Sequence, residues 1–384
     1  MKMEKLKIYV FLLFLVCAFN ISFTISGTFS QTKIENLSLM PRNHHVMAYD
    51  TESDRIVLFG GYEPNKHIIF NETWSYDVNN NVWTRMNPEV APVGGVSPAM
   101  VYDSKIDKMV LFGGLTEVNN HPIEYAETWT YDLNANKWEN LNPTNPPEPR
   151  IAHRMVYDSE LDLIIMQGGH RPSTGTTYND IWTYNYSANS WKKISVKDHP
   201  SRMDYCLFVY VPDFDKTVYF GDNGQTWIYD AINKNYTNIN PTSSPIGRGG
   251  SAVSYNTNND EIILFGGSSN GYSSGLKDLW SYDYSSNTWG IVNLSNSPSE
   301  RFFSSMAFDS ESNSTILFGG GNSLTDFPYN DTWSFNFDLN EWSQIKPSLT
   351  SLIQNKKTDW SFTFFCSGMF ILLSFKLIRR KRLP

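Results

Sequence analysis

The chain has 384 residues, 15% of them aromatic, and it carries 24 glycines and only three cysteines. Its formal net charge is −8 at pH 7. Many of its basic residues lie at the two ends, so the acidic region between them repels nucleic acid at long range and we expect no nucleic-acid partner. Cys17 and Cys366 lie in apolar terminal segments, which leaves Cys206 alone in the central region and excludes a disulfide there. The length suits one large domain.

Residues 1–26 are typical of a secretory signal peptide. Basic residues precede an apolar run, Ile8–Phe19, and Thr24 and Ser26 supply the small residues of a cleavage site. An uncleaved N-terminal anchor is the alternative, because the apolar character continues through Ile25. Residues 27–40 then form a short N-terminal segment.

A repeated pattern occupies the centre of the chain. Its first copy, Arg55–Trp83, reads RIVLFGGYEPNKHIIFNETWSYDVNNNVW. The diglycine recurs at Gly60/Gly61, Gly113/Gly114, Gly168/Gly169, Gly266/Gly267 and Gly319/Gly320, with a degraded copy at Gly221/Asp222. A first tryptophan follows at Trp74, Trp129, Trp182, Trp227, Trp280 and Trp333, and a second aromatic at Trp83, Trp138, Trp191, Tyr236, Trp289 and Trp342. These two columns contain every tryptophan of the chain except Trp360.

A period of about 50 residues with VLFGG and TWSYD segments resembles the kelch repeat. The resemblance covers Pro41–Pro347. It implies an all-β fold, a six-bladed kelch-type β-propeller over residues 41–347 with one four-stranded blade per repeat. It also implies a role mostly in interaction rather than chemistry.

Each repeat reads as four strands separated by polar turns. In the first repeat we expect strands at His45–Tyr49, Ile56–Phe59, Thr73–Tyr76 and Val82–Met86. Thr32–Leu39 is a candidate extra outer strand that would help to close the ring.

The loops that follow the diglycines vary most between repeats. Blade four has only DNGQT (222–226) there, so we expect a notch in that rim. The notch is either a ligand entrance or a simple loop deletion.

One base and one acid recur in most repeats. The bases at the start of strand one are Arg42, Arg150, Arg202, Arg248 and Arg301, and the acids before the first tryptophan are Glu72, Glu127, Asp180, Asp278 and Asp331, with Gln225 in blade four. In one interpretation they form Arg–carboxylate bridges within the scaffold. In the other, Arg202 lacks an acid in its own blade and holds a carboxylate ligand. The five arginines and Gln225 are therefore the candidate ligand-binding residues.

The sequence predicts neither a catalytic residue nor a metal or cofactor. His45 and His153 follow their arginines on non-adjacent blades, which is a weak basis for a metal site. A copper site of the galactose-oxidase kind needs a Cys–Tyr crosslink, but Cys206 is adjacent to Tyr205 and points to the other strand face. Phosphate-loop, HExxH and Gly-x-Ser-x-Gly motifs do not occur.

The C-terminal end predicts a membrane anchor. Residues 348–358 read as a polar linker, residues 359–378 as a transmembrane helix, and residues 379–384 as a basic cytoplasmic tail. A cleaved sorting tail is the alternative. Seven Asn-x-Ser/Thr sites would be glycan acceptors in an exported protein, at Asn36, Asn71, Asn185, Asn235, Asn293, Asn313 and Asn330.

These features together predict a recognition module in the cell membrane, single-pass, with the propeller extracellular and the tail cytoplasmic. It would bind a protein or glycan through the loop face of the propeller without enzyme activity. The alternative is an exported kelch-type enzyme that acts on an acidic sugar, resembling the sialic-acid mutarotase group and using channel Arg and Asp/Glu residues.

Overall fold

The computed structural model describes residues 23–30, 39–119, 121–201, 203–323, 328–351, 357–367 and 370–377. The chain divides into two units, one of residues 37–352 and one of residues 1–36 with 353–384. Each unit is described by itself.

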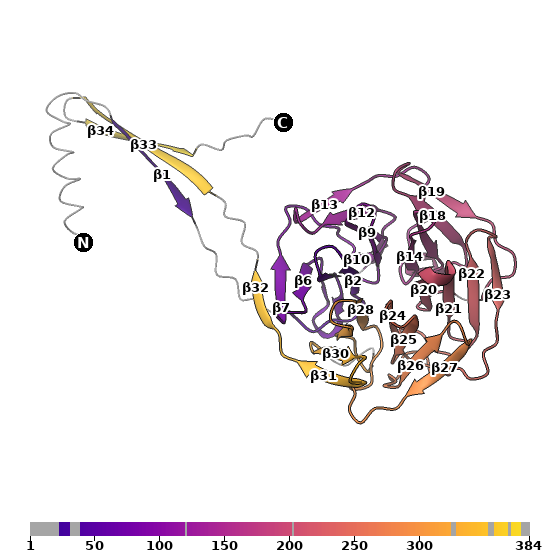
Figure 1. Cartoon of the computed structure of the whole chain (residues 1–384). Helices are drawn as coiled ribbons and strands as arrows, with labels where there is room; N and C mark the ends of the chain where they lie inside the picture. Colours follow the sequence, from indigo (N-terminus) through magenta and orange to yellow (C-terminus); the bar gives the residue numbers. More distant parts are fainter. Residues whose placement is uncertain are drawn as a thin grey trace. The chain divides into compact units, whose positions relative to one another are not determined.

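The larger unit is a six-bladed β-propeller, as the repeats predict (Figure 1). Blade one consists of β2 (Val46–Asp50), β3 (Arg55–Phe59), β6 (Thr73–Asp77) and β7 (Val82–Met86). The next two blades are β8 (Ala99–Asp103), β9 (Lys108–Phe112), β12 (Thr128–Asp132), β13 (Lys137–Asn140), and β14 (Arg154–Asp158), β15 (Leu163–Gln167), β18 (Ile181–Asn185), β19 (Ser190–Ile194). The last three are β20 (Leu207–Val211), β21 (Lys216–Phe220), β22 (Thr226–Asp230), β23 (Asn235–Asn238); β24 (Ala252–Asn256), β25 (Glu261–Phe265), β26 (Leu279–Asp283), β27 (Thr288–Val292); and β28 (Ser305–Asp309), β29 (Ser314–Phe318), β30 (Thr332–Asn336), β31 (Glu341–Ile345).

The second strand of each blade is apolar on both faces because each blade packs between two others. Ile56, Val57, Leu58 and Phe59 of β3 are all fully buried. Ile56 and Leu58 contribute to a core shared with blade six, and Val57 and Phe59 to a core shared with blade two. The hydrophobic run before each diglycine therefore supplies two inter-blade cores at once.

The diglycines join neighbouring blades through their backbone. The N–H of the second glycine donates to a carbonyl at the start of the next blade: Gly61 to Gly95 (2.7 Å), Gly114 to Arg150 (3.1 Å), Gly169 to Met203 (3.1 Å), Gly267 to Arg301 (2.9 Å) and Gly320 to Arg42 (2.9 Å). Both glycines of these pairs have positive φ, where a side chain is strained. Gly60 thus has a structural role that only glycine fills, as do its equivalents.

The second aromatic column also links the blades. Trp138 Nε1 donates to Thr73 Oγ1 of the preceding blade at 2.8 Å, and Trp83 donates to Thr332 of blade six at 3.2 Å, which closes the ring. Where Ile181 replaces the threonine, Tyr236 replaces the tryptophan and its hydroxyl donates to Gln167 at 2.5 Å. The corresponding bonds of Trp191 and Trp289 go to Thr128 and Thr226. Trp342 faces a blade that carries Leu279 instead, and its buried Nε1 has no hydrogen-bond partner among the described residues.

A C-terminal strand completes blade one. β32 (Ser348–Ser351) pairs in parallel with β7 as a fifth, outer strand. The Ser348 N–H donates to Asn81 O at 3.1 Å, just as the Thr144 N–H of blade two donates to Asn189 O of blade three at 3.1 Å. β32 is therefore the last in a series of segments that each run from one blade onto the outer edge of the next.

Two expectations about this region change. Residues 348–351 are a strand, so the polar linker predicted over 348–358 is wrong there, because a linker composition also suits a short exposed edge strand. The N-terminal segment Thr32–Leu39 lies outside the described residues except for Leu39, which is buried in the core between blades one and six. The outer edge of β7, where an added strand would pair, is occupied by β32.

Removing β32 is expected to loosen the ring. A chain that ends at Pro347 should lose about 2 kcal/mol of unfolding free energy relative to one that ends at Leu352, since it loses the backbone hydrogen bonds to β7. For a domain of this size that corresponds to a fall in melting temperature of about 3 °C. Equal melting temperatures for the two chains, measured by circular dichroism, would show that β32 does not close the propeller.

The smaller unit is a three-stranded sheet in the order β1 (Phe23–Ser30), β33 (Lys357–Ser367) and β34 (Phe370–Leu377). The prediction of a transmembrane helix over residues 359–378 is wrong for the described residues, which are antiparallel strands. Aromatic and β-branched residues such as those of WSFTFF favour strands, and apolar length alone does not distinguish strand from helix.

In the described part of the chain, no helix has the length and apolar character to span a membrane. Residues 1–22 and 379–384, which carry most of the predicted signal peptide and all of the predicted tail, lie outside the described residues.

Candidate functional site

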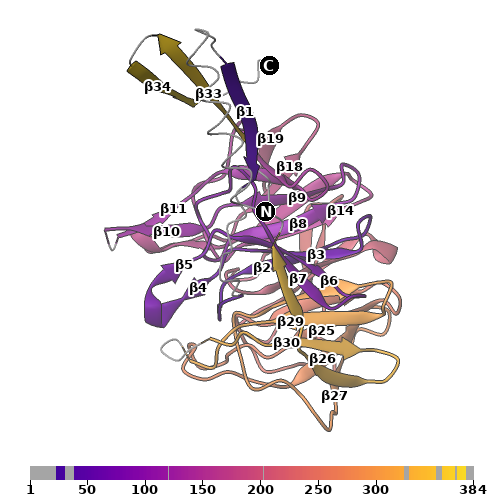
Figure 2. The same cartoon turned by 90° about the vertical axis from the view of Figure 1, so that its left-hand side faces the viewer.

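The two faces of the propeller differ in relief. The loops after the diglycines form one of them, which we call the diglycine face, and the turns between strands one and two and between strands three and four form the other, the turn face. Hairpins β4 (Tyr62–Glu63)–β5 (Ile68–Ile69) and β10 (Leu115–Val118)–β11 (His121–Glu124) project from the diglycine face (Figure 2). In blade three, β16 (His170–Arg171) and β17 (Thr176–Thr177) enclose a short 3-10 helix, Pro172–Thr174. Blades one to three therefore carry hairpins on this rim, and blade four has the shortest loop, so the rim is low at blade four.

A closed ring of backbone hydrogen bonds surrounds the channel beneath this face. One residue per blade, two positions before strand one, donates its N–H to the carbonyl of the same residue in the preceding blade. The six bonds are Ser97 to His44, Ala152 to Ser97, Tyr205 to Ala152, Gly250 to Tyr205, Phe303 to Gly250 and His44 to Phe303, all of 2.8–3.0 Å. All six residues have positive φ. The ring holds the start of every blade in place.

Three blades place an aromatic side chain at this left-handed position. His44, Tyr205 and Phe303 have φ of 56°, 52° and 55°, a conformation that is rare for bulky side chains and costs on the order of 1 kcal/mol each. Small residues, namely Ser97, Ala152 and Gly250, serve the other three blades. The backbone ring therefore does not require aromatic residues.

The aromatic side chains meet in one cluster. His44 stacks on Phe303 with ring centroids 3.8 Å apart, and Tyr205 lies 4.8 Å from Phe303. Tyr272, from the loop of blade five, approaches Phe303 at 4.7 Å and Tyr205 at 5.7 Å. We call His44, Tyr205, Tyr272 and Phe303 the aromatic cluster. Phe303 is buried and the other three are only half-buried, so the cluster presents aromatic surface on the diglycine face.

A pocket of about 410 Å³ adjoins the cluster at the low side of the rim. It is lined by Asp204, Asp222, Gly247, Arg248, Gly249, Ser268, Ser269, Gly271 and Tyr272. Asp222 belongs to the short loop of blade four, so the predicted notch is present as a pocket between blades four and five. Gln225 is exposed in this loop and accepts a bond from Trp227 Nε1 at 3.3 Å.

Four of the predicted site arginines bond within their own blades. Arg150 is fully buried, donates to Glu148 O and Gly168 O, and pairs with Asp180 at 2.6 and 3.3 Å. The equivalent pairs are Arg42–Glu72, Arg248–Asp278 and Arg301–Asp331, each with the same two backbone acceptors. The scaffold bridges that the sequence suggested are thus present. Burial raises the pKa of Asp180, but the bonds and charge of Arg150 outweigh it and leave that pKa below its usual value.

In blade four, the position of the paired arginine is not occupied by Arg202, contrary to the sequence comparison of the repeats. Each paired arginine lies four residues before strand one and bonds to the glycine 18 residues later. In blade four that position is Met203, whose carbonyl accepts the Gly169 N–H as the arginine carbonyls do in other blades. The placement of Arg202 in this column is therefore wrong by one residue. Arg202 itself lies outside the described residues, and its proposed contact with a carboxylate ligand stays a prediction.

The same shift places Cys206, and not Tyr205, in the column of His45 and His153. Both histidines are buried, and neither ring has a hydrogen-bond partner in the described structure. The described residues contain no group of His, Cys, Asp or Glu arranged to hold a metal ion. Burial raises the pKa of the Cys206 thiol to about 12, so it is protonated and unreactive at neutral pH.

The buried histidines make stability depend on pH. Burial lowers the pKa of His45 to about 3 and that of His153 well below 6.5, so both are neutral when folded and titrate near 6.5 when unfolded. Their contribution is complete above pH 6.5 and is lost as pH falls toward 3, by about 1.4 kcal/mol per pH unit for each histidine. The unfolding free energy, measured with urea between pH 6.5 and 4.5, should fall less steeply with falling pH in the double variant His45→Gln/His153→Gln than in the wild type. An unchanged pH dependence of the unfolding free energy would mean that the pKa values of the two histidines do not change on unfolding.

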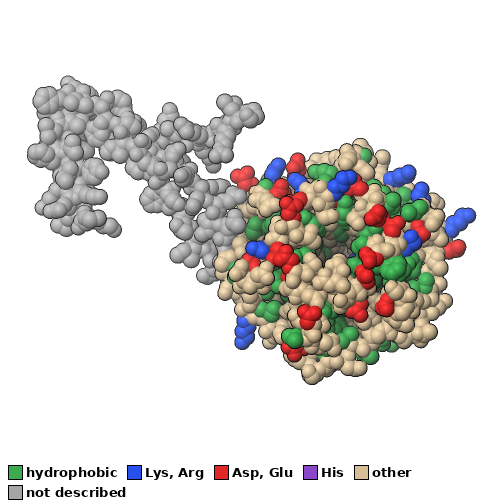
Figure 3. Space-filling view, viewed as in Figure 1, with side chains coloured by type: hydrophobic (Ala, Val, Ile, Leu, Met, Phe, Trp, Pro, Cys, Tyr) green, Lys and Arg blue, Asp and Glu red, His purple; other side chains and the backbone are tan. Residues whose placement is uncertain are grey.

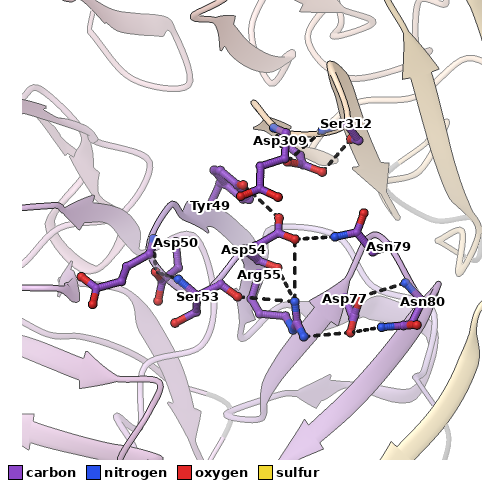
Figure 4. Close-up of polar contacts among 12 residues, drawn as sticks. Tyr49, Asp50, Ser53, Asp54, Arg55, Asp77, Asn79, Asn80, Asp309 and Ser312 are labelled. Atoms are coloured by element: carbon purple, nitrogen blue, oxygen red, sulfur yellow. Dashed lines mark hydrogen bonds and ion pairs between the residues drawn. The ribbon is translucent and has the colours of Figure 1, made fainter.

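The turn face carries the acids that lie nearest the channel (Figure 3). A tyrosine at the end of strand one donates to the aspartate five residues later: Tyr49–Asp54 (2.9 Å), Tyr102–Asp107 (2.9 Å), Tyr157–Asp162 (3.1 Å), Tyr210–Asp215 (3.1 Å) and Tyr255–Asp260 (2.7 Å). In blade one, Asp54 also accepts from Asn79, and Arg55 pairs with Asp77 (Figure 4). Blade six has Phe308 and Asn313, so both members of the pair change together. These acids therefore stabilise turns.

The fold and the diglycine face define a kelch-type propeller, a class of protein-binding module. The chain belongs to the KLHDC2/KLHL20/DRC7 Kelch-repeats domain family, whose model matches residues 16–221 and 216–369.

Several known proteins are similar to this chain. Mei4-dependent protein 6 of Schizosaccharomyces pombe is 23% identical over 354 residues, covering 81% of this chain and 49% of that protein. Kelch domain-containing protein 10 of Xenopus laevis is 26% identical over 169 residues, 42% of this chain and 38% of that protein. The solved structure of YjhT matches 80% of this chain and 100% of its own with a TM-score of 0.59 and 14% identity, which shows the fold alone. The chain spans half or less of the length of these two curated relatives.

Proposed function

We propose that the propeller recognises a protein through the diglycine face, with the aromatic cluster as its anchor. The observation that carries this proposal is that His44, Tyr205 and Phe303 adopt a strained backbone conformation where other blades use Ser, Ala or Gly. Strain of this kind persists where it has a function. Partly exposed Tyr side chains are typical anchors of protein interfaces.

The surface around the cluster is uneven, so it suits a projecting segment of a partner protein better than a flat face of one. High hairpins of blades one to three lie on one side of the rim, and the pocket at Asp222 and Tyr272 lies on the low side. Glu124 accepts from the Ser173 backbone and hydroxyl at 2.7 Å each, which ties the loops of blades two and three together. A segment of the partner would cross the cluster and enter the pocket.

We also propose that the propeller is exported and presented at the cell surface, where a glycan is a second possible ligand. The N-terminal sequence of residues 1–26 motivates the first point. Among the described Asn-x-Ser/Thr sites, Asn71, Asn235, Asn293 and Asn330 are exposed and so accessible to glycosylation. Treatment of the native protein with peptide N-glycosidase F should lower its apparent mass. An unchanged mass, together with a cytosolic location by fractionation, would contradict export.

An exported enzyme that acts on an acidic sugar is the second candidate. It was expected to use the arginine column and the channel acids. Because the four described arginines of that column bond within their blades, such an enzyme would need other groups. The fold similarity to YjhT is compatible with either function.

Affinity capture with matched variants tests the protein-binding proposal. The tagged full-length chain is compared with Tyr205→Ala/Tyr272→Ala on the diglycine face and with Phe214→Ala on the turn face, where Phe214 is 37% exposed. The amount of partner captured should be at least tenfold lower for Tyr205→Ala/Tyr272→Ala than for the wild type, and unchanged for Phe214→Ala. Retention of the same partners by a folded Tyr205→Ala/Tyr272→Ala variant would overturn the proposal.

A further inference from the structure

The central channel contains a cavity of about 370 Å³ that is lined by the first strands of all six blades. The first residues of these strands are Val46, Ala99, Arg154, Leu207, Ala252 and Ser305. Five of them are neutral, so Arg154 is the one charged member of this ring. Arg154 lines the cavity and is partly buried.

Arg154 differs from the four arginines of the scaffold. Its Nε donates to Cys206 O at 2.8 Å, which orients the guanidinium. Within the described residues, no carboxylate pairs with it, and Nη1 and Nη2 have no hydrogen-bond acceptor, whereas each scaffold arginine pairs with an acid of its own blade. A partly desolvated charge without a counter-charge is costly, and a bound anion would remove that cost.

We infer that the channel binds a small monocarboxylate, held by Nη1 and Nη2 of Arg154. A carboxylate matches the planar pair of Nη donors, and one unpaired guanidinium balances one negative charge. Ala48, Val101 and Val253 line the cavity and offer apolar surface to the body of the acid. The cavity has the volume of a small-molecule site. This site does not depend on the protein-binding role of the diglycine face.

Calorimetric titration of the full-length protein with benzoate tests the inference, with benzamide as the neutral ligand of the same shape. We expect benzoate to bind and benzamide not to bind. Arg154→Gln should weaken benzoate binding at least about 30-fold, which is the effect of removing one partner of a buried charge pair. Arg154→Lys keeps the charge but not the planar pair of donors, so it should weaken benzoate binding less than Arg154→Gln does.

Controls separate this site from other sources of binding. Arg55→Gln, on the turn face, should leave benzoate affinity unchanged. A blocked peptide, acetyl-Gly-Gly-Glu-Gly-Gly-amide, distinguishes a free acid from a carboxylate of a protein, and we expect it not to bind. The inference is overturned if benzoate does not bind the wild type, if benzamide binds equally well, or if benzoate binds folded Arg154→Gln as tightly as the wild type. If Arg154→Gln does not fold, the Arg154→Lys and benzamide results decide the question.

Discussion

Replacing Arg150 by methionine is expected to cost about 3 kcal/mol of unfolding free energy, because it removes the bidentate partner of the largely buried Asp180 and leaves only the exposed Lys193 as a charge partner. The side chain of Asp180 is 11% exposed, and it would retain Trp182 Nε1 at 2.8 Å as a hydrogen-bond donor and the exposed Lys193 at 3.4 Å as an ion-pair partner. The substitution also removes donors from Gly168 O and Glu148 O. Urea unfolding of the wild type and the variant at pH 7 measures the difference.

Blade four supplies the control for this prediction. There Met203 replaces the arginine and Gln225 replaces the acid, so the chain itself contains the neutral pair. Arg150→Met combined with Asp180→Gln should therefore be more stable than Arg150→Met alone. If the double variant is less stable than the single one, the cost of Arg150→Met does not come from an unpaired acid.

Gly168→Ala is expected to destabilise the propeller by about 2–5 kcal/mol. The residue has φ 63°, and a Cβ atom would lie 2.1 Å from the Met203 carbonyl oxygen of the next blade. The left-handed conformation accounts for about 1–2 kcal/mol and the steric overlap for about 1–3 kcal/mol.

Gly175→Ala separates these two contributions. Gly175 has φ 65°, but a Cβ atom there would meet no atom within 4 Å. We expect it to cost about 1 kcal/mol, as measured by the shift of the urea midpoint. Equal costs at Gly168 and Gly175 would mean that the diglycine does not need close contact with the next blade.

The regular columns made the fold predictable from sequence. Strand two is apolar on both faces in each repeat, and the second aromatic follows each first tryptophan by nine residues, so six repeats can be counted from the sequence. The resemblance to the kelch repeat then implied one blade for each repeat. The Arg–acid bridges were predictable as well, because both partners recur in the same register.

The exceptions to the columns were harder to place. Arg202 was matched by residue type, although its distance from Gly221 is one residue longer than the constant spacing of 18. That spacing was the signal that identifies Met203. The aromatic cluster was missed because its members come from three left-handed positions and one loop, and no local pattern brings them together. The apolar C-terminal segment has the length of a span, and its strand pairing depends on residues 23–30 at the other end of the chain.

Photo-crosslinking from the two faces tests the central claim most directly. A p-benzoylphenylalanine residue is introduced at Tyr272, in the aromatic cluster, or at Phe214, on the turn face, in otherwise wild-type full-length chains expressed in cells of the native host. The account predicts ultraviolet-dependent crosslinks to a partner protein from position 272 and none to that partner from position 214. Crosslinks to the same partner from position 214 alone would contradict recognition through the diglycine face.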